Sequence, residues 1–290
     1  MARACPLLLA LTLTACVPSA APPPPRGDSP PPTATSAAPA DSAPPVAAAP
    51  ADSASPVAPA PEPPKERFDA TLPVEVKVAG DLTAHVAHGA VGNKQAIVYL
   101  HGRCGDITKF RAWTDAAIHY GTVVALFGDE KCKEGGYKWG DGVDRTDRRI
   151  LAALRAVSAV RSAPLDLDAI TLVGYSQGSA RAEALVRRFP ARYKRAVLVA
   201  GPKEHAPSSF HDALGIAVVA GGRDLKQHLI EAAQHATKAG VRARYFELPG
   251  ARHGDYGDSA VRVMSEVFAW VYAAPAPAAS PSPPSPTGTL

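Results

Sequence analysis

The distribution of proline is the feature that most limits what this chain can fold into. Of its 30 prolines, 17 lie in residues 17–65 and six lie in residues 274–290. Because proline fixes φ and has no backbone N–H, segments this rich in it form neither helices nor central strands. The sequence therefore predicts one folded domain over residues 66–273, which is long enough for a single core. A disordered tail is expected from 274 to 290.

The first residues predict an export signal. Residues 1–3 are short and positively charged, and residues 6–14 are apolar, as in a secretory signal peptide. Leu13-Thr14-Ala15-Cys16 then resembles the bacterial lipobox, in which the signal is cut before the cysteine and the cysteine is lipidated. The resemblance implies a signal peptide over residues 1–15 and a membrane anchor at Cys16 in the bacterial cell envelope, with plain secretion as the alternative. Val17 replaces the aspartate that often marks inner-membrane retention, which favours the outer membrane.

Residues 16–65 are expected to form a stalk between this anchor and the domain. They contain too few large apolar side chains to build a core. Their prolines favour extended chain at about 3.1 Å per residue, so the stalk could reach on the order of 100 Å.

Charge and hydropathy exclude two classes of protein. The net charge is only +4, with no run of five basic residues and no zinc-finger spacing, which argues against a nucleic-acid partner. No apolar run reaches about 18 residues, so a membrane protein with several spans is excluded.

Apolar runs alternate with helical patterns through the domain. Segments 73–79 and 82–88 alternate apolar and polar residues, which predicts an antiparallel hairpin. Continuous apolar runs then predict strands covered on both faces. The alternation indicates an α/β class with a mostly parallel central sheet and helices on both faces. The expected strands are 96–100, 122–126, 170–173, 196–199, 216–219 and 244–247, and the expected helices include 150–157, 177–190, 225–239 and 261–271.

Gly174-Tyr175-Ser176-Gln177-Gly178 stands between an expected strand and an expected helix. In this context Gly-x-Ser-x-Gly is typical of a nucleophile elbow, a tight turn that exposes the serine and needs small neighbours. The helix N-terminus would place backbone N–H groups beside the serine oxygen. We interpret Ser176 as a nucleophile, with a Ser-Gly turn that merely packs as the alternative.

A nucleophilic serine needs a base, and the base needs an orienting acid. Asp224 and His253 each follow an expected strand, so both should reach the same sheet edge as Ser176. His253 lies in a glycine-rich loop, whereas the other late histidines, such as His205, are expected on the surface or on helices.

The acid is the less certain member of this set. Glu204 and Asp255 are rivals to Asp224. Asp224 could alternatively cap the helix 225–239, because aspartate is a good N-cap residue.

The turn His101-Gly102-Arg103 follows the strand 96–100. With the elbow and the order Ser, Asp, His, it resembles the α/β-hydrolase superfamily, near its small esterases of dienelactone-hydrolase type, over nearly all of residues 73–273. The resemblance implies an α/β-hydrolase fold with no large cap domain. It also implies an oxyanion hole made by the backbone N–H groups of Arg103 and Gln177, whose side chains are then free to vary, and a structural role for His101.

The resemblance implies a serine hydrolase that cleaves carboxylic esters through an acyl-enzyme, with no cofactor and no metal ion. An open site would admit an ester substrate that is bulky or polymeric. A dienelactone hydrolase proper would have cysteine in place of Ser176. Two alternatives remain: a serine peptidase of prolyl-oligopeptidase type, and a non-catalytic envelope lipoprotein that uses the scaffold for binding.

Cys104 and Cys132 remain after the signal is removed and Cys16 is lipidated. They follow strands 96–100 and 122–126, which are neighbours in this fold, so a disulfide would tie two loops together, with free thiols as the alternative. The loop 127–145 contains Tyr137 and Trp139 and is expected either to line an acyl pocket or to lie on the surface.

Overall fold

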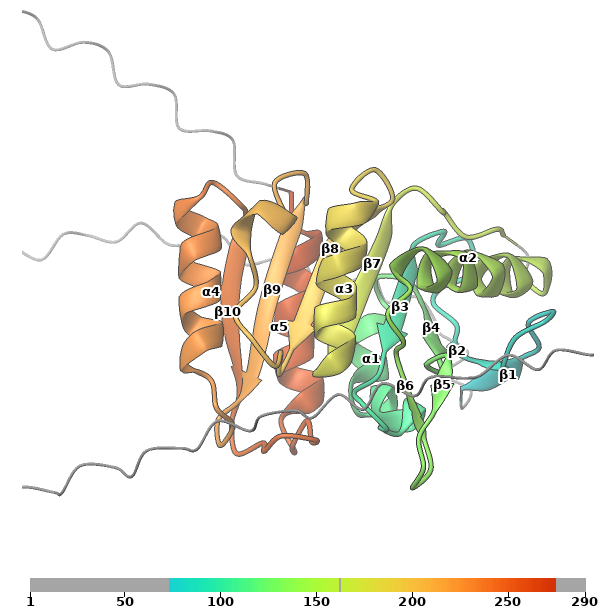
Figure 1. Ribbon diagram of the computed structural model, residues 1–290. Coiled ribbons are helices and arrows are strands. Elements are labelled where there is room, and N and C mark those ends of the chain that lie inside the picture. The colour runs from blue at the N-terminus through green and yellow to red at the C-terminus, as the bar shows by residue number, and fades with distance from the viewer. Residues whose placement is uncertain (1–72, 162, 275–290) are drawn as a thin grey trace, which may run out of the picture. The chain divides into compact units, whose positions relative to one another are not determined.

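The computed structural model describes residues 73–161 and 163–274 (Figure 1). The expected signal peptide, Cys16, the stalk and the tail beyond 274 lie outside the described residues. Within the described ranges, no helix combines the length and the apolar composition needed to cross a bilayer.

The described residues build an eight-stranded sheet in the order β1-β2-β4-β3-β7-β8-β9-β10. The predicted hairpin is confirmed: β1 pairs antiparallel with β2, which pairs antiparallel with β4. Every pairing from β4 to β10 is parallel. The strands are β1 (Val74–Val76), β2 (Ala84–Ala87), β3 (Ala96–Leu100), β4 (Thr122–Leu126), β7 (Ile170–Tyr175), β8 (Tyr193–Val199), β9 (Gly215–Gly221) and β10 (Ala243–Leu248).

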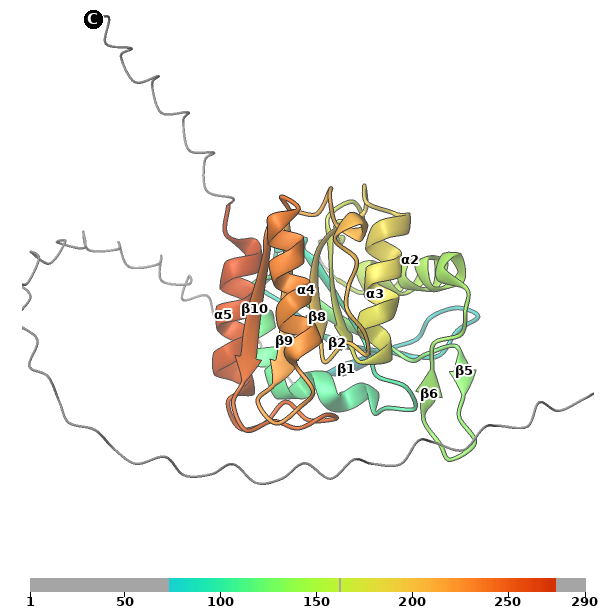
Figure 2. The ribbon, with the colours of Figure 1, turned by 60° about the vertical axis from the view of Figure 1, so that its left-hand side comes forward.

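Helices cover both faces of the sheet, as Figures 1 and 2 show. One core layer lies under α2 (Val143–Ala159), α3 (Gln177–Arg188) and α4 (Gln227–Lys238). The other lies under the 3₁₀ helix η1 (Ile107–Trp113), α1 (Thr114–Ala117) and α5 (Ala260–Tyr272). Because both faces are covered, β3, β4, β7 and β9 are buried along their whole length. Two small elements complete the fold: the hairpin β5 (Glu130–Lys131) and β6 (Tyr137–Lys138), and η2 (Pro207–Ser209).

Two helices differ from their predicted form. The helix expected over 225–239 begins at Gln227, so Leu225 lies in the preceding loop and is 84% exposed. In α5 the buried stripe includes Val263 and leaves Val261 exposed, because the stripe follows the 3.6-residue period from Ala260. Both expected apolar stripes are otherwise present.

Candidate active site

The loops that follow β3, β7, β9 and β10 meet at the carboxyl edge of the parallel strands. This is the position at which α/β sheets bring functional side chains together. The four loops carry the predicted residues Arg103, Ser176, Asp224 and His253.

The turn between β7 and α3 is strained at Ser176. This residue has φ 49° and ψ −112°, a backbone conformation that residues other than glycine rarely adopt. A Cβ atom on Gly174 would overlap the Gly178 carbonyl, and one on Gly178 would overlap the Leu100 carbonyl. Glycine is therefore required at both positions, as the elbow interpretation predicts, and the turn presents the serine hydroxyl at the sheet edge.

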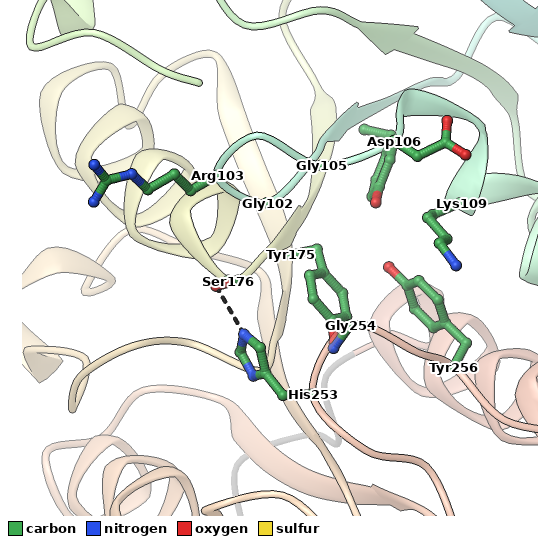
Figure 3. Close-up of a pocket in the computed structure, with 11 residues that line it drawn as sticks. Gly102, Arg103, Gly105, Asp106, Lys109, Tyr175, Ser176, His253, Gly254 and Tyr256 are labelled. Carbon is green, nitrogen blue, oxygen red and sulfur yellow. Dashed lines mark hydrogen bonds between the residues drawn. The ribbon is translucent and has the colours of Figure 1, made fainter. Parts of the chain in front are cut away.

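A continuous hydrogen-bonded chain joins the three predicted residues (Figure 3 shows its first link). His253 Nε2 lies 3.1 Å from Ser176 Oγ, and His253 Nδ1 lies 2.9 Å from Asp224 Oδ2. A carboxylate can only accept, so Nδ1 carries the proton and Nε2 is free to accept from the serine hydroxyl. The arrangement can move a proton from Ser176 to His253 while Asp224 holds the imidazole in place.

The other acids are engaged elsewhere. Glu204 pairs with His235 at 2.6 Å, and Asp255 accepts a hydrogen bond from the Gly257 N–H. Asp224 does not cap α4, whose N-cap is Lys226; its second oxygen accepts from the Leu225 N–H at 2.7 Å. The cap alternative is therefore wrong.

Tyr175 supports the loop that carries His253, a role that no pattern in the sequence indicates. Its hydroxyl accepts a hydrogen bond from the Gly254 N–H, and its ring lies 5.8 Å from the His253 ring. Burial raises the pKa of Tyr175, so it stays a neutral phenol. The residue inside the elbow thus also fixes the loop that carries the base.

The expected oxyanion donors lie on either side of Ser176. The Gln177 N–H is the first in α3, so it has no partner within the helix. Among the described residues, no group accepts a hydrogen bond from the Arg103 N–H. Gly102, directly before Arg103, lies beside Ser176: an added Cβ would be in van der Waals contact with the serine Cβ, 3.4 Å away.

A pocket of about 300 Å³ opens beside Ser176 and His253 (Figure 3). One wall is the loop 102–106, with Lys109 from η1. The other walls are aromatic, from Tyr99, Tyr175 and Tyr256. Among the described residues that line this pocket, none is aliphatic.

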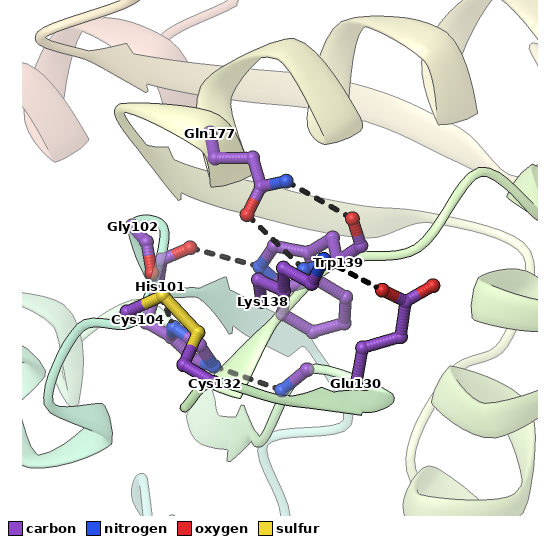
Figure 4. Close-up of a disulfide and its surroundings, with 9 residues drawn as sticks. His101, Gly102, Cys104, Glu130, Cys132, Lys138, Trp139 and Gln177 are labelled. Atoms are coloured by element: carbon purple, nitrogen blue, oxygen red, sulfur yellow. Dashed lines mark hydrogen bonds and ion pairs between the residues drawn. A yellow bond between two sulfur atoms is a disulfide. The ribbon is translucent and has the colours of Figure 1, made fainter. Parts of the chain in front are cut away.

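No residue of the loop 127–145 lines this pocket. The interpretation that Tyr137 and Trp139 line an acyl pocket is therefore wrong for the pocket beside Ser176. The loop instead contains the β5–β6 hairpin, which a disulfide and a β-bridge join to the loop after β3. The predicted disulfide is present: Cys104 and Cys132 are joined, with their Cα atoms 5.8 Å apart. Its surroundings are drawn in Figure 4.

Two histidines have interior positions. His101 is fully buried; its Nε2 accepts from the Gly128 N–H at 2.8 Å and its Nδ1 donates to the Gly102 carbonyl at 2.6 Å. Burial lowers the pKa of His101, which keeps it neutral and fits a structural role. His205, expected on the surface or on a helix, is instead buried in a loop, because the segment after β8 folds back over α3. In the described part of the chain, no three His, Cys, Asp or Glu side chains are grouped to hold a metal ion.

No protein-family model matches the sequence, and no curated protein matches it. Among solved structures, an arylesterase is similar over 72% of this chain and 86% of its own, with a TM-score of 0.51 and 15% identity. An esterase from Pyrobaculum calidifontis matches 71% of this chain and 86% of its own, with a TM-score of 0.51 and 16% identity. Carboxylesterase NP, a naproxen esterase from Bacillus subtilis, matches 69% and 92%, with a TM-score of 0.50 and 12% identity.

These likenesses concern the fold. The mostly parallel eight-stranded sheet with helices on both faces is the α/β-hydrolase fold, as the sequence predicted. No large cap domain covers the sheet edge in residues 73–161 and 163–274.

Proposed function

We propose that this protein is a serine hydrolase that cleaves carboxylic ester bonds. The observation that carries the proposal is the hydrogen-bonded chain Ser176–His253–Asp224, which begins at a strained elbow and opens onto a pocket. Strain at one backbone position costs on the order of 1–3 kcal/mol and persists where the surroundings hold it, commonly at functional sites. The esterases among the similar structures support an ester as the substrate.

The proposed reaction has two halves. Ser176 Oγ attacks the ester carbonyl and its proton passes to His253 Nε2, while Asp224 stabilises the resulting imidazolium. The backbone N–H groups of Arg103 and Gln177 bind the oxyanion, and each such donor contributes roughly 3 kcal/mol. The tetrahedral intermediate collapses, the alcohol leaves with the proton from Nε2, and an acyl-Ser176 ester remains. Water, deprotonated by Nε2, then repeats the sequence and releases the acid.

The pocket favours a compact group on one side of the ester bond. The lining by Tyr99, Tyr175 and Tyr256 suits a short or aromatic acyl group, whereas a long alkyl chain would meet no aliphatic wall among the described residues. His253 is 53% exposed, so the other side of the scissile bond faces solvent and can belong to a bulky or polymeric molecule.

No specific contact favours the two alternative functions. A peptidase would use the same three residues. Comparing the rates of hydrolysis of matched ester and amide substrates would distinguish a peptidase from an esterase. A binding protein has no need of a strained serine within hydrogen-bonding distance of an imidazole.

The envelope location is part of the proposal and rests on the lipobox resemblance at Cys16. Two acyl signals would hold a protein stably on a bilayer, since each buried CH₂ contributes roughly 0.8 kcal/mol. We expect the full-length protein to sediment with membranes and Cys16→Ser to be released. Equal sedimentation of both proteins would contradict the anchor.

The function is tested by labelling the full-length protein with a fluorophosphonate, which reacts with activated serines. We expect the parent and Ser265→Ala, which alters a half-buried serine on α5, to be labelled equally, and Ser176→Ala to remain unlabelled. A panel of nitrophenyl esters should show faster turnover of acetate and butyrate than of palmitate. A folded parent that neither reacts with the probe nor hydrolyses any ester would overturn the proposal.

A further inference from the structure

The two proposed oxyanion donors lie on separate loops, one after β3 and one at the start of α3. The two loops touch directly, because a Cβ atom added to Gly178 would overlap the Leu100 carbonyl and Gly102 lies against Ser176. Both loops are also hydrogen-bonded to one residue, Trp139, which directly follows the β5–β6 hairpin.

Trp139 binds the α3 side through its backbone (Figure 4). Its N–H donates to Gln177 Oε1 at 3.1 Å, and its carbonyl accepts from Gln177 Nε2 at 3.0 Å. The next residue, Gly140, accepts a further hydrogen bond from Arg181 of α3. The side chain of Gln177 is therefore not free to vary, contrary to the expectation for an oxyanion donor that uses only its backbone.

Trp139 binds the other loop through its indole. Nε1 donates to the His101 carbonyl at 2.8 Å, and the two rings lie 5.3 Å apart. The indole is 3% exposed, so water does not compete for this hydrogen bond. The His101 carbonyl precedes Gly102 and Arg103 directly in the chain, so the bond acts on the turn that carries the first donor.

The hairpin is itself fixed to that turn. The Cys104–Cys132 disulfide and a β-bridge between Gly105 and Tyr137 join the two segments. Gly136 approaches the Cys104 carbonyl so closely that an added Cβ would lie 2.6 Å from the carbonyl oxygen. The β5–β6 hairpin, which leads into Trp139, is thus held firmly against the turn that contains Arg103.

We propose that Trp139 is a positioning residue that sets the separation of the Arg103 and Gln177 N–H groups, through the His101 carbonyl on one side and the Gln177 amide on the other. The inference rests on the proposed function. A misplacement of about 1 Å can cost roughly 100-fold in rate, so the loss of one of these links has a measurable effect.

Two substitutions test the two links separately. Trp139→Phe removes the indole donor but keeps an aromatic ring and the backbone pair. Gln177→Met removes both side-chain bonds and keeps the backbone N–H of residue 177. We expect each to lower kcat by about tenfold with KM nearly unchanged, because the donors act on the transition state. Trp270→Phe is the matched control, since Trp270 packs on Phe246 and Arg242, away from the pocket lining.

The double variant gives a second measure. Because both links act through Trp139, the effects on kcat should be non-additive, and the double variant should lose less than the product of the single losses. Full kcat in folded Trp139→Phe and Gln177→Met, with only a lower Tm, would show a merely structural role and overturn the proposal.

A readout without turnover separates this inference from the proposed function. In the inactive Ser176→Ala background, we expect Trp139→Phe to speed amide hydrogen exchange in residues 101–105, and Gln177→Met to speed it in residues 177–179, relative to Trp270→Phe. Unchanged exchange in both segments would overturn the positioning role. A parent with no esterase activity would instead overturn the proposed function, and the exchange result would still decide whether Trp139 fixes the two loops.

Discussion

The protein contains two serine–histidine–carboxylate chains with nearly the same hydrogen bonds and different surroundings. In the first, His253 lies 3.1 Å from Ser176 and 2.9 Å from Asp224. In the second, His205 Nε2 lies 3.1 Å from Ser179 Oγ, and His205 Nδ1 lies 2.8 Å from Glu183 Oε2. The two serines are three residues apart on the same turn and helix.

What separates the two chains is access and backbone geometry. Ser179, His205 and Glu183 are almost fully buried, and Ser179 lies within α3. Ser176 stands at positive φ beside a pocket, next to the Arg103 and Gln177 N–H groups that we propose as oxyanion donors. The second chain joins the loop after β8 to α3, and we propose that it stabilises the fold whereas the first performs catalysis.

Removing the two hydroxyl groups in turn should separate activity from stability most sharply. Ser176→Ala removes the proposed nucleophile, and we expect kcat to fall by about 10⁴-fold or more with an unchanged Tm. Ser179→Ala should leave the rate of the folded protein close to that of the parent. It should lower the free energy of unfolding by about 1–3 kcal/mol, because a buried His205 nitrogen loses its partner. Ester kinetics and urea unfolding of both variants give the measurement.

The carboxylates offer the next comparison. Asp224→Asn presents an amide to His253 and favours the wrong tautomer, so kcat should fall by about 10³–10⁴-fold. Glu183→Gln makes the matching change at His205 and should cost about 3 kcal/mol of stability while kcat changes little. A large loss of kcat in folded Glu183→Gln would contradict the division between the two chains.

The Cys104–Cys132 disulfide lies beside the proposed site around Ser176 and makes no link to the buried set around His205. Replacing Cys104 and Cys132 together by serine opens a loop of 28 residues, which should cost about 3 kcal/mol of stability. Because the hairpin then moves more freely beside Arg103, kcat should also fall, by less than in Trp139→Phe. Denaturant unfolding measures the loss of stability, and ester kinetics measure the loss of kcat. The parent treated with a reductant serves as a second comparison. An unchanged kcat would separate the hairpin from the oxyanion donors.

Low pH should reduce the stability that the hydrogen-bonded set Ser179–His205–Glu183 contributes. Burial alone would raise the pKa of Glu183, but hydrogen bonds from His205, the Ala206 N–H and Ser209 lower it below 4.5. A carboxyl whose pKa is lower in the folded state stabilises the fold above its unfolded value and loses that contribution as the pH falls through the folded value. The Tm of the parent should therefore exceed that of Glu183→Gln by the largest amount at neutral pH, and this difference should shrink below about pH 4.5. A constant difference down to pH 3 would contradict the lowered pKa.

The sequence predicted the parts that depend on local pattern. Ser176 is identified by the glycines that its turn requires, and Asp224 and His253 by their positions after strands. The order of these strands brings the three loops together, so the fold follows from the alternation of strands and helices. The disulfide followed from the neighbouring positions of β3 and β4.

The rest depended on tertiary contacts that no local pattern encodes. His205 is buried because a loop folds back over α3, and its partner Glu183 gives no signal in a helix rich in charged residues. Trp139 could be recognised as a large side chain in a glycine-rich loop, but not as the partner of both His101 and Gln177. Leu225 was misplaced because α4 begins two residues later than its apolar spacing suggests.

The most direct test of the central claim is to trap the acyl-enzyme. The full-length protein is mixed with a nitrophenyl acetate, quenched in acid and mapped by peptide fragmentation, which resolves Ser176 from Ser179 within one peptide. We predict an acetyl group on Ser176 that forms in the parent and is absent when His253 is replaced by alanine. Acetyl on Ser179, or turnover with no acylated serine, would contradict the assignment of Ser176 as the nucleophile.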